Sequence, residues 1–402
     1  MDWANSSHPG VLAAKRLAKW ALRRTVYRRA VYRPRREERP FLLRLDVNNT
    51  CNMLCKGCFY PRYLATRPPK RYMPVEEFKT LVDRLFPYAY MAQLACGFEA
   101  MMHPRFAEIV RLMDRWPVPN GGIVTNGALL SGMNAEALLD SRTIRTVSVS
   151  LDALDPEVFA LVRGRPLAER VRRNVEEFLE KRRARGQALP SLKLNVTVMR
   201  SNAADLPSVM RWAAAEGVDE AQFNHIEPFG EANPESMIHD PEGYQALVED
   251  ILGQAEAAGM RAFIPPAFSA DVFDWSAKQY RWSNYQDAAP GAYDKASTTR
   301  FDPRADHPYP SGVYCVCPWM TLNVDAWGNL YPCGPRAGGP PFANILRQDL
   351  DEAINSMKFL RLRRAMLRGE QEERCPGCRT TMPYADPLKR KTTRRLADDE
   401  RD

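Results

Sequence analysis

The chain has 402 residues, of which 45% are hydrophobic and 26% are charged, and its formal net charge at pH 7 is +8. This length suggests two to three domains with ample material for a large core. The longest apolar runs fall well short of the roughly 20 residues that a membrane-spanning helix needs. The composition therefore excludes a helical membrane-spanning protein and predicts a soluble globular one.

Residues 1–40 hold eleven Lys or Arg against three Asp or Glu, so they carry the whole net charge and the rest is formally neutral. Within them, residues 11–36 predict a basic helix that packs on the domain behind it, lies on an anionic membrane surface or touches nucleic acid. We favour packing, because arginines interrupt the apolar stripe. Peripheral membrane contact stays open, and no nucleic-acid partner is expected. The segment lacks the apolar core and cleavage site of a signal peptide.

Residues 41–264 alternate short apolar strands with longer helical segments. The predicted strands are Leu42–Asp46, Ala92–Gly97, Gly121–Thr125, Thr146–Leu151, Lys193–Val198 and Glu220–His225. The predicted helices are Pro74–Phe86, Phe106–Arg115, Ala135–Leu139, Leu167–Gly186, Ala204–Gly217 and Pro241–Gly259. Six β–α units predict a parallel sheet with helices outside, and such barrels gather their chemistry at the carboxyl ends of the strands.

Three cysteines directly after the first strand, Cys51, Cys55 and Cys58, have the spacing C-x3-C-x2-C. Three thiolates hold three irons of a four-iron cube and leave the fourth iron open, whereas most iron–sulfur sites supply four cysteines. A structural zinc site and a buried cluster of reduced thiols are the alternatives. Because the chain's cysteines are clumped and no secretion signal is found, metal binding is favoured over disulfides, and a reducing cytoplasm is the expected location.

This three-cysteine spacing after a first strand resembles the signature of the radical S-adenosylmethionine (SAM) superfamily. The resemblance implies an α/β fold with a partial (β/α)6 TIM-type barrel and a [4Fe–4S] cluster on the three cysteines. It also implies that SAM binds the open iron and is cleaved by one electron to a 5′-deoxyadenosyl radical, which abstracts hydrogen from a substrate. A reducing donor such as a flavodoxin or ferredoxin is then expected as a partner.

A smaller module at 313–385 follows an irregular, aromatic-rich segment at 265–312 and precedes a charged tail at 386–402. In the module, Thr321–Val324 and Asn329–Tyr331 predict two strands of a hairpin. A helix is predicted at Asp349–Leu367, so the module is a small cysteine-rich hairpin and helix domain.

Four cysteines of this module, Cys317, Cys333, Cys375 and Cys378, suit zinc or an iron–sulfur cluster equally well. Their pattern, with a glycine five residues before Cys333, resembles the SPASM auxiliary-cluster region of radical SAM enzymes. No cysteine follows Cys378, so the resemblance is to the shortened, single-cluster version, sometimes called a Twitch domain. It implies one auxiliary [4Fe–4S] cluster on these four cysteines, with Cys315 as an alternative to Cys317.

The resemblance also implies where SAM binds. Gly97 and Glu99 match the family's Gly-Gly-Glu-Pro motif and are expected to hold the methionine ammonium, although Phe98 and Ala100 depart from that motif. The further cofactor-binding candidates are Thr125, Asn126, Ser150, Asp152 and Arg163. Ser150 and Asp152 are expected at the ribose, and Arg163 at the SAM carboxylate. Each polar residue could instead serve as a helix cap or turn residue.

His225 and Glu227 close the sixth strand and are the candidates for a catalytic base or a substrate contact. A carbon radical beside a deprotonated hydroxyl is strongly reducing, and a nearby auxiliary cluster is suited to accept its electron. The module resembles those of single-cluster dehydrogenases that act on aminocyclitols and sugars. We therefore predict a radical SAM oxidoreductase for a small hydroxylated metabolite. The alternatives are a ribosomal-peptide maturase, modification of a lipid-linked substrate, and a non-catalytic metal-stapled scaffold.

Overall fold

The structure is a computed structural model that divides into two compact units. The barrel unit comprises Leu42–Asp302 and Val324–Gly328, and the C-terminal unit comprises Met1–Phe41, Pro303–Asn323 and Asn329–Asp402. The residues that the structure describes are 30–226, 232–269, 273–274, 279–280, 315, 317–334 and 339–368. Most of the predicted basic helix at 11–36, most of the segment 265–312 and the whole tail at 386–402 lie outside them.

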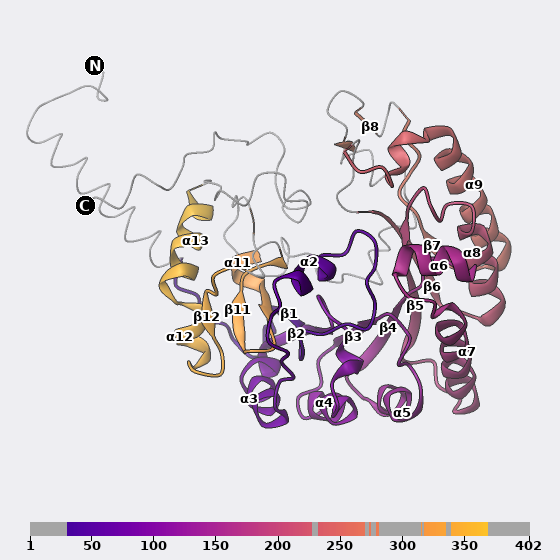
Figure 1. Cartoon of the computed structure of the whole chain (residues 1–402). Helices are drawn as coiled ribbons and strands as arrows, with labels where there is room; N and C mark the ends of the chain where they lie inside the picture. The colour runs from indigo at the N-terminus through magenta and orange to yellow at the C-terminus, as the bar shows by residue number, and fades with distance from the viewer. Residues whose placement is uncertain are drawn as a thin grey trace, which may run out of the picture. The chain divides into compact units, whose positions relative to one another are not determined.

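The barrel unit is built on a curved sheet in which the strands β1 to β7 follow one another in chain order (Figure 1). Their bounds are β1 Phe41–Leu45, β2 Ala89–Leu94, β3 Asn120–Thr125, β4 Ile144–Ser150, β5 Ser191–Val198, β6 Glu220–His225 and β7 Arg261–Phe263. All the neighbouring pairs from β2 to β7 are parallel. The α/β fold and the six predicted strands are confirmed, and β7 extends the sheet beyond them.

Helices line the outer side of this sheet (Figure 1). They are α3 Val75–Leu85, α4 Phe106–Met113, α5 Gly132–Asp140, α7 Ala168–Ala184, α8 Leu206–Glu216 and α9 Pro241–Ala258. The strand β5 shows why: its alternate residues are fully buried and half-buried along its whole length. Because successive side chains of a strand point to opposite faces, one face of β5 packs on the helices and the other forms the inner face of the sheet.

Two helices of the barrel unit were not predicted, α2 (Tyr60–Ala65) and α6 (Pro156–Arg163). Both are short, and α6 carries local signals for both its ends. Asp155 accepts hydrogen bonds from the backbone N–H groups of Glu157 and Val158, each at 2.9 Å. At the other end Gly164 adopts a left-handed conformation with φ of 69°, a common way for a helix to stop.

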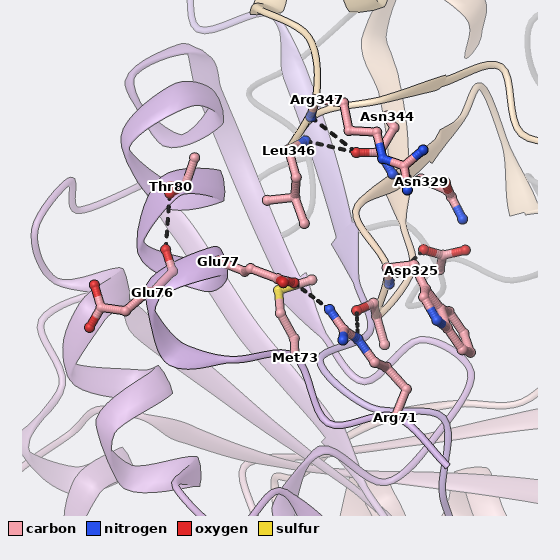
Figure 2. A network of polar contacts seen from close by, with 12 residues as sticks. Arg71, Met73, Glu76, Glu77, Thr80, Asp325, Asn329, Asn344, Leu346 and Arg347 are labelled. Atoms are coloured by element: carbon pink, nitrogen blue, oxygen red, sulfur yellow. Dashed lines mark hydrogen bonds and ion pairs between the residues drawn. The ribbon is translucent and has the colours of Figure 1, made fainter. Parts of the chain in front are cut away.

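The C-terminal unit contains the antiparallel pair β11 (Asn329–Tyr331) and β12 (Ala343–Asn344), with β10 (Thr321–Val324) on the other side of β11. The two predicted hairpin strands are confirmed. Asn344 ends β12 in a tight turn, because its side-chain oxygen accepts hydrogen bonds from the backbone N–H groups of Leu346 and Arg347 (Figure 2). Its amide also donates to the side-chain oxygen of Asn329 at 3.0 Å.

Three helices complete the described part of this unit: α11 Cys317–Met320, α12 Leu350–Ile354 and α13 Met357–Leu367. The prediction of a single helix at Asp349–Leu367 is wrong in one respect. The structure has two helices there, and Asn355 and Ser356 separate them. The Asn355 amide donates back to the carbonyl of Asp351 at 2.9 Å, which supports the end of α12. A short strand pair, β8 (Phe273–Asp274) and β9 (Gln279–Tyr280), belongs to the barrel unit. In the described part of the chain, every helix is too short or too polar to cross a bilayer.

Candidate functional site

The loop between β1 and α2 carries Cys51, Cys55 and Cys58, all three half-buried. Backbone bonds fix the middle of this loop to the end of α6. Leu54 N–H donates to the carbonyl of Arg163 at 3.2 Å, and Lys56 N–H donates to that of Val162 at 2.8 Å. These bonds fix the position of the loop relative to α6, with its thiols at the carboxyl ends of the strands.

Asn49 supports the same loop from its other side. Its side-chain oxygen accepts a hydrogen bond from the Arg71 backbone N–H at 2.7 Å, and its amide donates to the Tyr63 hydroxyl at 2.7 Å. The Arg71 side chain pairs with Glu77 of α3 and donates to the carbonyl of Ala326 at 3.1 Å (Figure 2). All these residues belong to the barrel unit. Since the Asn49 amide is almost fully buried, these bonds satisfy groups that water does not reach.

Gly164 permits the contact between α6 and the cysteine loop. A Cβ at this position would lie 2.5 Å from the carbonyl oxygen of Leu54, a backbone atom that cannot move freely. We expect Gly164→Ala to push the loop away and to lower the iron that the three cysteines retain after anaerobic reconstitution.

Gly186→Ala is the matched control. Gly186 has a similar positive φ of 64°, but a Cβ there would meet nothing within 4 Å. Both variants place a side chain on a residue with a left-handed backbone conformation, at a cost of about 1–2 kcal/mol. Only Gly164→Ala should also lose iron. Equal iron in the two variants would show that the α6 contact does not shape the cysteine loop.

A buried carboxylate, Glu99, lies beside this loop with 2% of its surface exposed. It accepts hydrogen bonds from the backbone N–H of Asn126 at 2.7 Å, from the Thr125 hydroxyl at 3.0 Å and from the Met101 N–H at 3.2 Å. Burial raises the pKa of Glu99, although these hydrogen bonds work in the opposite direction. An ammonium group beside Glu99 would relieve the burial cost of its charge, so the site suits a cationic ligand.

Asn126 links this carboxylate to the first cysteine. Its backbone N–H binds Glu99, and its side-chain amide donates to Asn52 at 2.6 Å and approaches the Cys51 sulfur at 3.8 Å. Thr125 is the last residue of β3 and Asn126 follows it directly, which explains how a strand end delivers both groups to one point. The structure therefore brings together four of the predicted residues: Glu99, Thr125, Asn126 and Cys51.

Arg163 is the second group that reaches the cysteine loop. Its guanidinium donates to the Cys55 sulfur at 3.3 Å, binds the carbonyl of Ser150 and lies 3.2 Å from the Asp152 carboxylate. The side chains of Arg163 and Asp152 are 9% and 3% exposed, so this ion pair is buried. Asp152 also accepts a hydrogen bond from the Thr197 N–H at 2.7 Å. Both residues thus have internal partners at the positions where a ribose and a SAM carboxylate were expected.

The donor set fits an iron–sulfur cube at the three cysteines. Burial raises the pKa of the Cys51 thiol to about 11, so this sulfur becomes a ligand only when a positive centre replaces its proton. Two of the sulfurs already face N–H donors, Arg163 at Cys55 and Asn126 at Cys51, and such donors stabilise thiolates.

Asp46 is a residue at this site that the sequence analysis did not select. It follows β1 and accepts a hydrogen bond from the Gly97 N–H at 2.9 Å, so it holds the loop that leads to Glu99. Burial raises the pKa of Asp46 to about 6, against hydrogen bonds from the backbone of Gly97, Phe98 and Cys96. The sequence holds a signal for it, because Asp46 is the first residue past β1, as Asn126 is the first past β3.

His225 lies away from the inner face of the sheet. It pairs in register with Val198, a fully buried residue, and its ring lies 5.0 Å from that of Tyr244 in α9 and 5.6 Å from that of Phe268. This placement on the helix side gives no support to a role as catalytic base. Glu227, the other candidate, lies outside the described residues. Ser150 lies on the inner face, paired in register with Asn195.

The C-terminal unit gathers its own thiols. Cys315 and Cys317 are buried, and the pKa of Cys315 is raised first by a hydrogen bond with Cys317, then by burial and by the charge of Cys333. Cys315 and Cys317 therefore lie within hydrogen-bond contact of each other, and Cys315 remains an alternative to Cys317 as a ligand. Cys375 and Cys378 lie outside the described residues.

Two parts of the chain match known family models. Residues 45–213 match the model of the radical SAM superfamily. Residues 315–379 match the model of SPASM, an iron–sulfur cluster-binding domain. The first range contains the cysteine loop, Glu99, Asn126 and Arg163, and the second contains all the cysteines of the C-terminal unit.

Similar proteins fall into several activities. The chain is 25% identical over 246 residues to a GTP 3′,8-cyclase of Shewanella denitrificans, covering 61% of this chain and 67% of that protein. It is 25% identical over 200 residues to the tungsten-containing aldehyde ferredoxin oxidoreductase cofactor-modifying protein of Pyrococcus furiosus, covering 49% and 55%. The chain spans about half to two thirds of the length of the curated relatives that it matches.

Among solved structures, Streptococcus suis SuiB bound to S-adenosylmethionine has a TM-score of 0.58 at 15% identity, covering 85% of this chain and 71% of that chain. At this identity the likeness shows a shared fold.

Proposed function

Because the chain belongs to the radical SAM superfamily and ends in a SPASM iron–sulfur cluster-binding domain, we propose that it is an oxidoreductase for a small, uncharged, hydroxylated metabolite. The two domains imply a SAM-binding [4Fe–4S] cluster, an auxiliary [4Fe–4S] cluster and SAM itself. When bound, these groups supply a 5′-deoxyadenosyl radical that takes a hydrogen atom from the substrate, and an acceptor for the electron that the substrate then loses. A reducing partner of the flavodoxin or ferredoxin type is part of the proposal.

The residues of the barrel unit have distinct roles in this proposal. Cys51, Cys55 and Cys58 hold the first cluster, and Glu99 receives the ammonium of SAM in a site that excludes water. Arg163 keeps the cysteine loop in place and lies against the Cys55 sulfur as a fixed positive charge. Its contacts with Asp152 and Ser150 support this positioning role over direct contact with the SAM carboxylate.

The inner face of β4, β5 and β6 is the observation that carries the substrate class. In register, Ser150 lies beside Asn195, Asn195 beside Gln222, and Thr197 beside Asn224. The Asn224 amide donates to the Asn195 side-chain oxygen at 3.2 Å and accepts from Gln222 at 3.1 Å. These half-buried hydroxyl and amide groups both donate and accept, which suits the hydroxyl groups of a sugar or cyclitol.

Charge on this face is confined to the amino ends of the strands. Lys193 pairs with Glu220 at 2.5 Å, and Arg261 of β7 approaches the same carboxylate at 3.5 Å. Among the described residues on the inner face of β5 and β6, Lys193 and Glu220 are the charged ones, and they neutralise each other. A triphosphate would need several cations here, so this face favours an uncharged substrate.

We expect Asn195→Ala to lower kcat/KM for the substrate about 2- to 10-fold, because it removes one partner of a half-buried network of neutral hydrogen bonds, each worth about 0.5–1.5 kcal/mol. Cleavage of SAM without substrate should stay within about twofold, since the side-chain hydrogen bond that the variant loses is with Asn224, which is not among the residues proposed to bind SAM. The assay measures 5′-deoxyadenosine in the presence of sugars, aminocyclitols, GTP and peptides, with mass spectrometry to detect the loss of two hydrogens. Asn134→Ala, on the outer helix α5, is the matched control.

Three outcomes separate the alternatives. Turnover of GTP or of a peptide, with no response to sugars or cyclitols, would replace the proposed substrate class. Product without loss of two hydrogens would replace oxidation with a redox-neutral reaction. Absence of any SAM cleavage under reduction would leave a metal-stapled scaffold.

A further inference from the structure

Arg363 of α13 is completely buried within the C-terminal unit, with 0% of its surface exposed. Its Nε donates to the carbonyl of Pro318 at 2.9 Å, and one Nη donates to the carbonyl of Ala30 at 3.2 Å and to the Asn355 side chain at 3.1 Å. A single guanidinium thus ties together the N-terminal segment, α11 and the junction of α12 and α13.

Aromatic rings cover the same guanidinium. Its central carbon lies 5.2 Å from the centre of the Phe359 ring, 5.5 Å from that of Tyr32 and 5.9 Å from that of Trp319. Burial lowers the pKa of Arg363 to about 9, so the side chain remains a cation at neutral pH. Every partner of this cation among the described residues is uncharged.

A buried cation whose partners are neutral, as the described partners of Arg363 are, is costly, because dipoles and ring faces replace its hydration incompletely. Proteins usually offset such a charge with a carboxylate or another anion. One group that becomes anionic when it binds a cluster, the Cys317 thiol, belongs to the residue next to a partner of Arg363. Pro318, whose carbonyl Arg363 binds, directly follows Cys317, and Trp319 comes next along the same short helix.

We propose that Arg363 is the buried counter-cation of the auxiliary cluster, positioned to hold α11 and to favour the reduced state of that cluster. This inference rests on the proposed function, which places a [4Fe–4S] cluster on Cys317 and its partner thiolates. A cube with four thiolate ligands carries a net negative charge, and reduction by one electron adds one more. A fixed cation therefore stabilises the reduced form more than the oxidised form, which suits an acceptor of the substrate's electron.

The test measures the reduction equilibrium of the auxiliary cluster in the full chain. A Cys51/Cys55/Cys58→Ala background removes the other cluster, so that the EPR signal during a potentiometric titration comes from the auxiliary cluster alone. We expect Arg363→Met to shift the one-electron equilibrium at least tenfold toward the oxidised form, equivalent to about 59 mV. Arg363→Lys, which keeps the charge, should shift it less than about threefold.

Arg361→Met is the matched control, since Arg361 is an exposed residue on the same helix and loses the same charge. Its equilibrium should match that of the parent, because water screens a surface charge. An equal shift in Arg361→Met and Arg363→Met, or no shift in Arg363→Met at full iron content, overturns the inference.

A stability measurement decides the case in which Arg363→Met fails to keep its cluster. Arg363→Met removes three hydrogen bonds whether or not the cluster is bound, so it should lower the unfolding temperature in both states. A counter-cation matters most when the anion is bound, so the drop should be clearly larger in the cluster-loaded protein. Equal destabilisation with and without the cluster would show a purely structural role and would overturn the inference. If the parent itself binds no iron in the C-terminal unit, the auxiliary-cluster part of the proposed function fails instead.

Discussion

Replacement of Cys51, Cys55 and Cys58 by alanine is expected to abolish formation of 5′-deoxyadenosine from SAM, because these thiols are the proposed ligands of the cluster that delivers the electron. Iron per chain should fall from about eight to about four, since the C-terminal cysteines keep the auxiliary cluster. The measurement combines iron and sulfide counts after anaerobic reconstitution with a dithionite-driven SAM cleavage assay.

Cys96→Ala is the control for this experiment. Cys96 is also a half-buried thiol of the barrel unit, and it donates a hydrogen bond to the carbonyl of Gln93 at 3.5 Å, outside the cysteine loop. This variant should keep about eight irons and should still cleave SAM. Wild-type protein that contained zinc without labile sulfide, and that cleaved no SAM, would exclude the proposal that this protein is a radical SAM enzyme.

Arg163→Met is expected to lower the free energy of unfolding of the barrel unit by about 3–5 kcal/mol, because it leaves the buried Asp152 carboxylate without its counter-charge. The variant should also lose SAM cleavage, since it removes the guanidinium that contacts the Cys55 sulfur. Urea unfolding of the cluster-free protein measures the first effect, and the dithionite assay measures the second.

Two further variants interpret that loss. Arg165→Met removes an exposed arginine two residues away and should change stability by no more than about 0.5 kcal/mol. The double variant Arg163→Met/Asp152→Leu should recover part of the stability, because no unpaired buried charge remains. It should not recover SAM cleavage, which needs the contact with Cys55. A loss below about 1 kcal/mol in the single variant would contradict a strong buried pair.

The contacts of Arg163 and those of Arg363 have one feature in common. In the barrel unit, Arg163 is a cation that has both an internal anion, Asp152, and a thiol, Cys55. In the C-terminal unit, Arg363 has no anion among the described residues and lies next to the segment that carries Cys317. Each unit therefore places a buried guanidinium beside a predicted cluster ligand, by different local means.

The fold was predictable because its signals are local. Strand β5 alternates buried and half-buried residues without interruption, and the turn between β10 and β11 ends at Gly328 with φ of 77°. The three-cysteine loop was predictable from its spacing, since all three thiols of this set lie within one short loop. The same local rule also bears on His225. Ala221, Phe223 and His225 share one face of β6 by their spacing of two, which places His225 on the helix side.

The residue pattern thus predicts the order of strands and helices, the two cysteine sets and the loop after β2 that carries Glu99. Which distant residues meet depends on how the whole chain folds. Arg163 lies 108 positions from Cys55, and Arg363 lies 333 positions from Ala30, yet each pair is in contact. Such pairs form when each unit folds and buries side chains that are far apart in the sequence. The cost of burying a charge then selects its neighbours, and that cost depends on three-dimensional surroundings which no spacing in the sequence records.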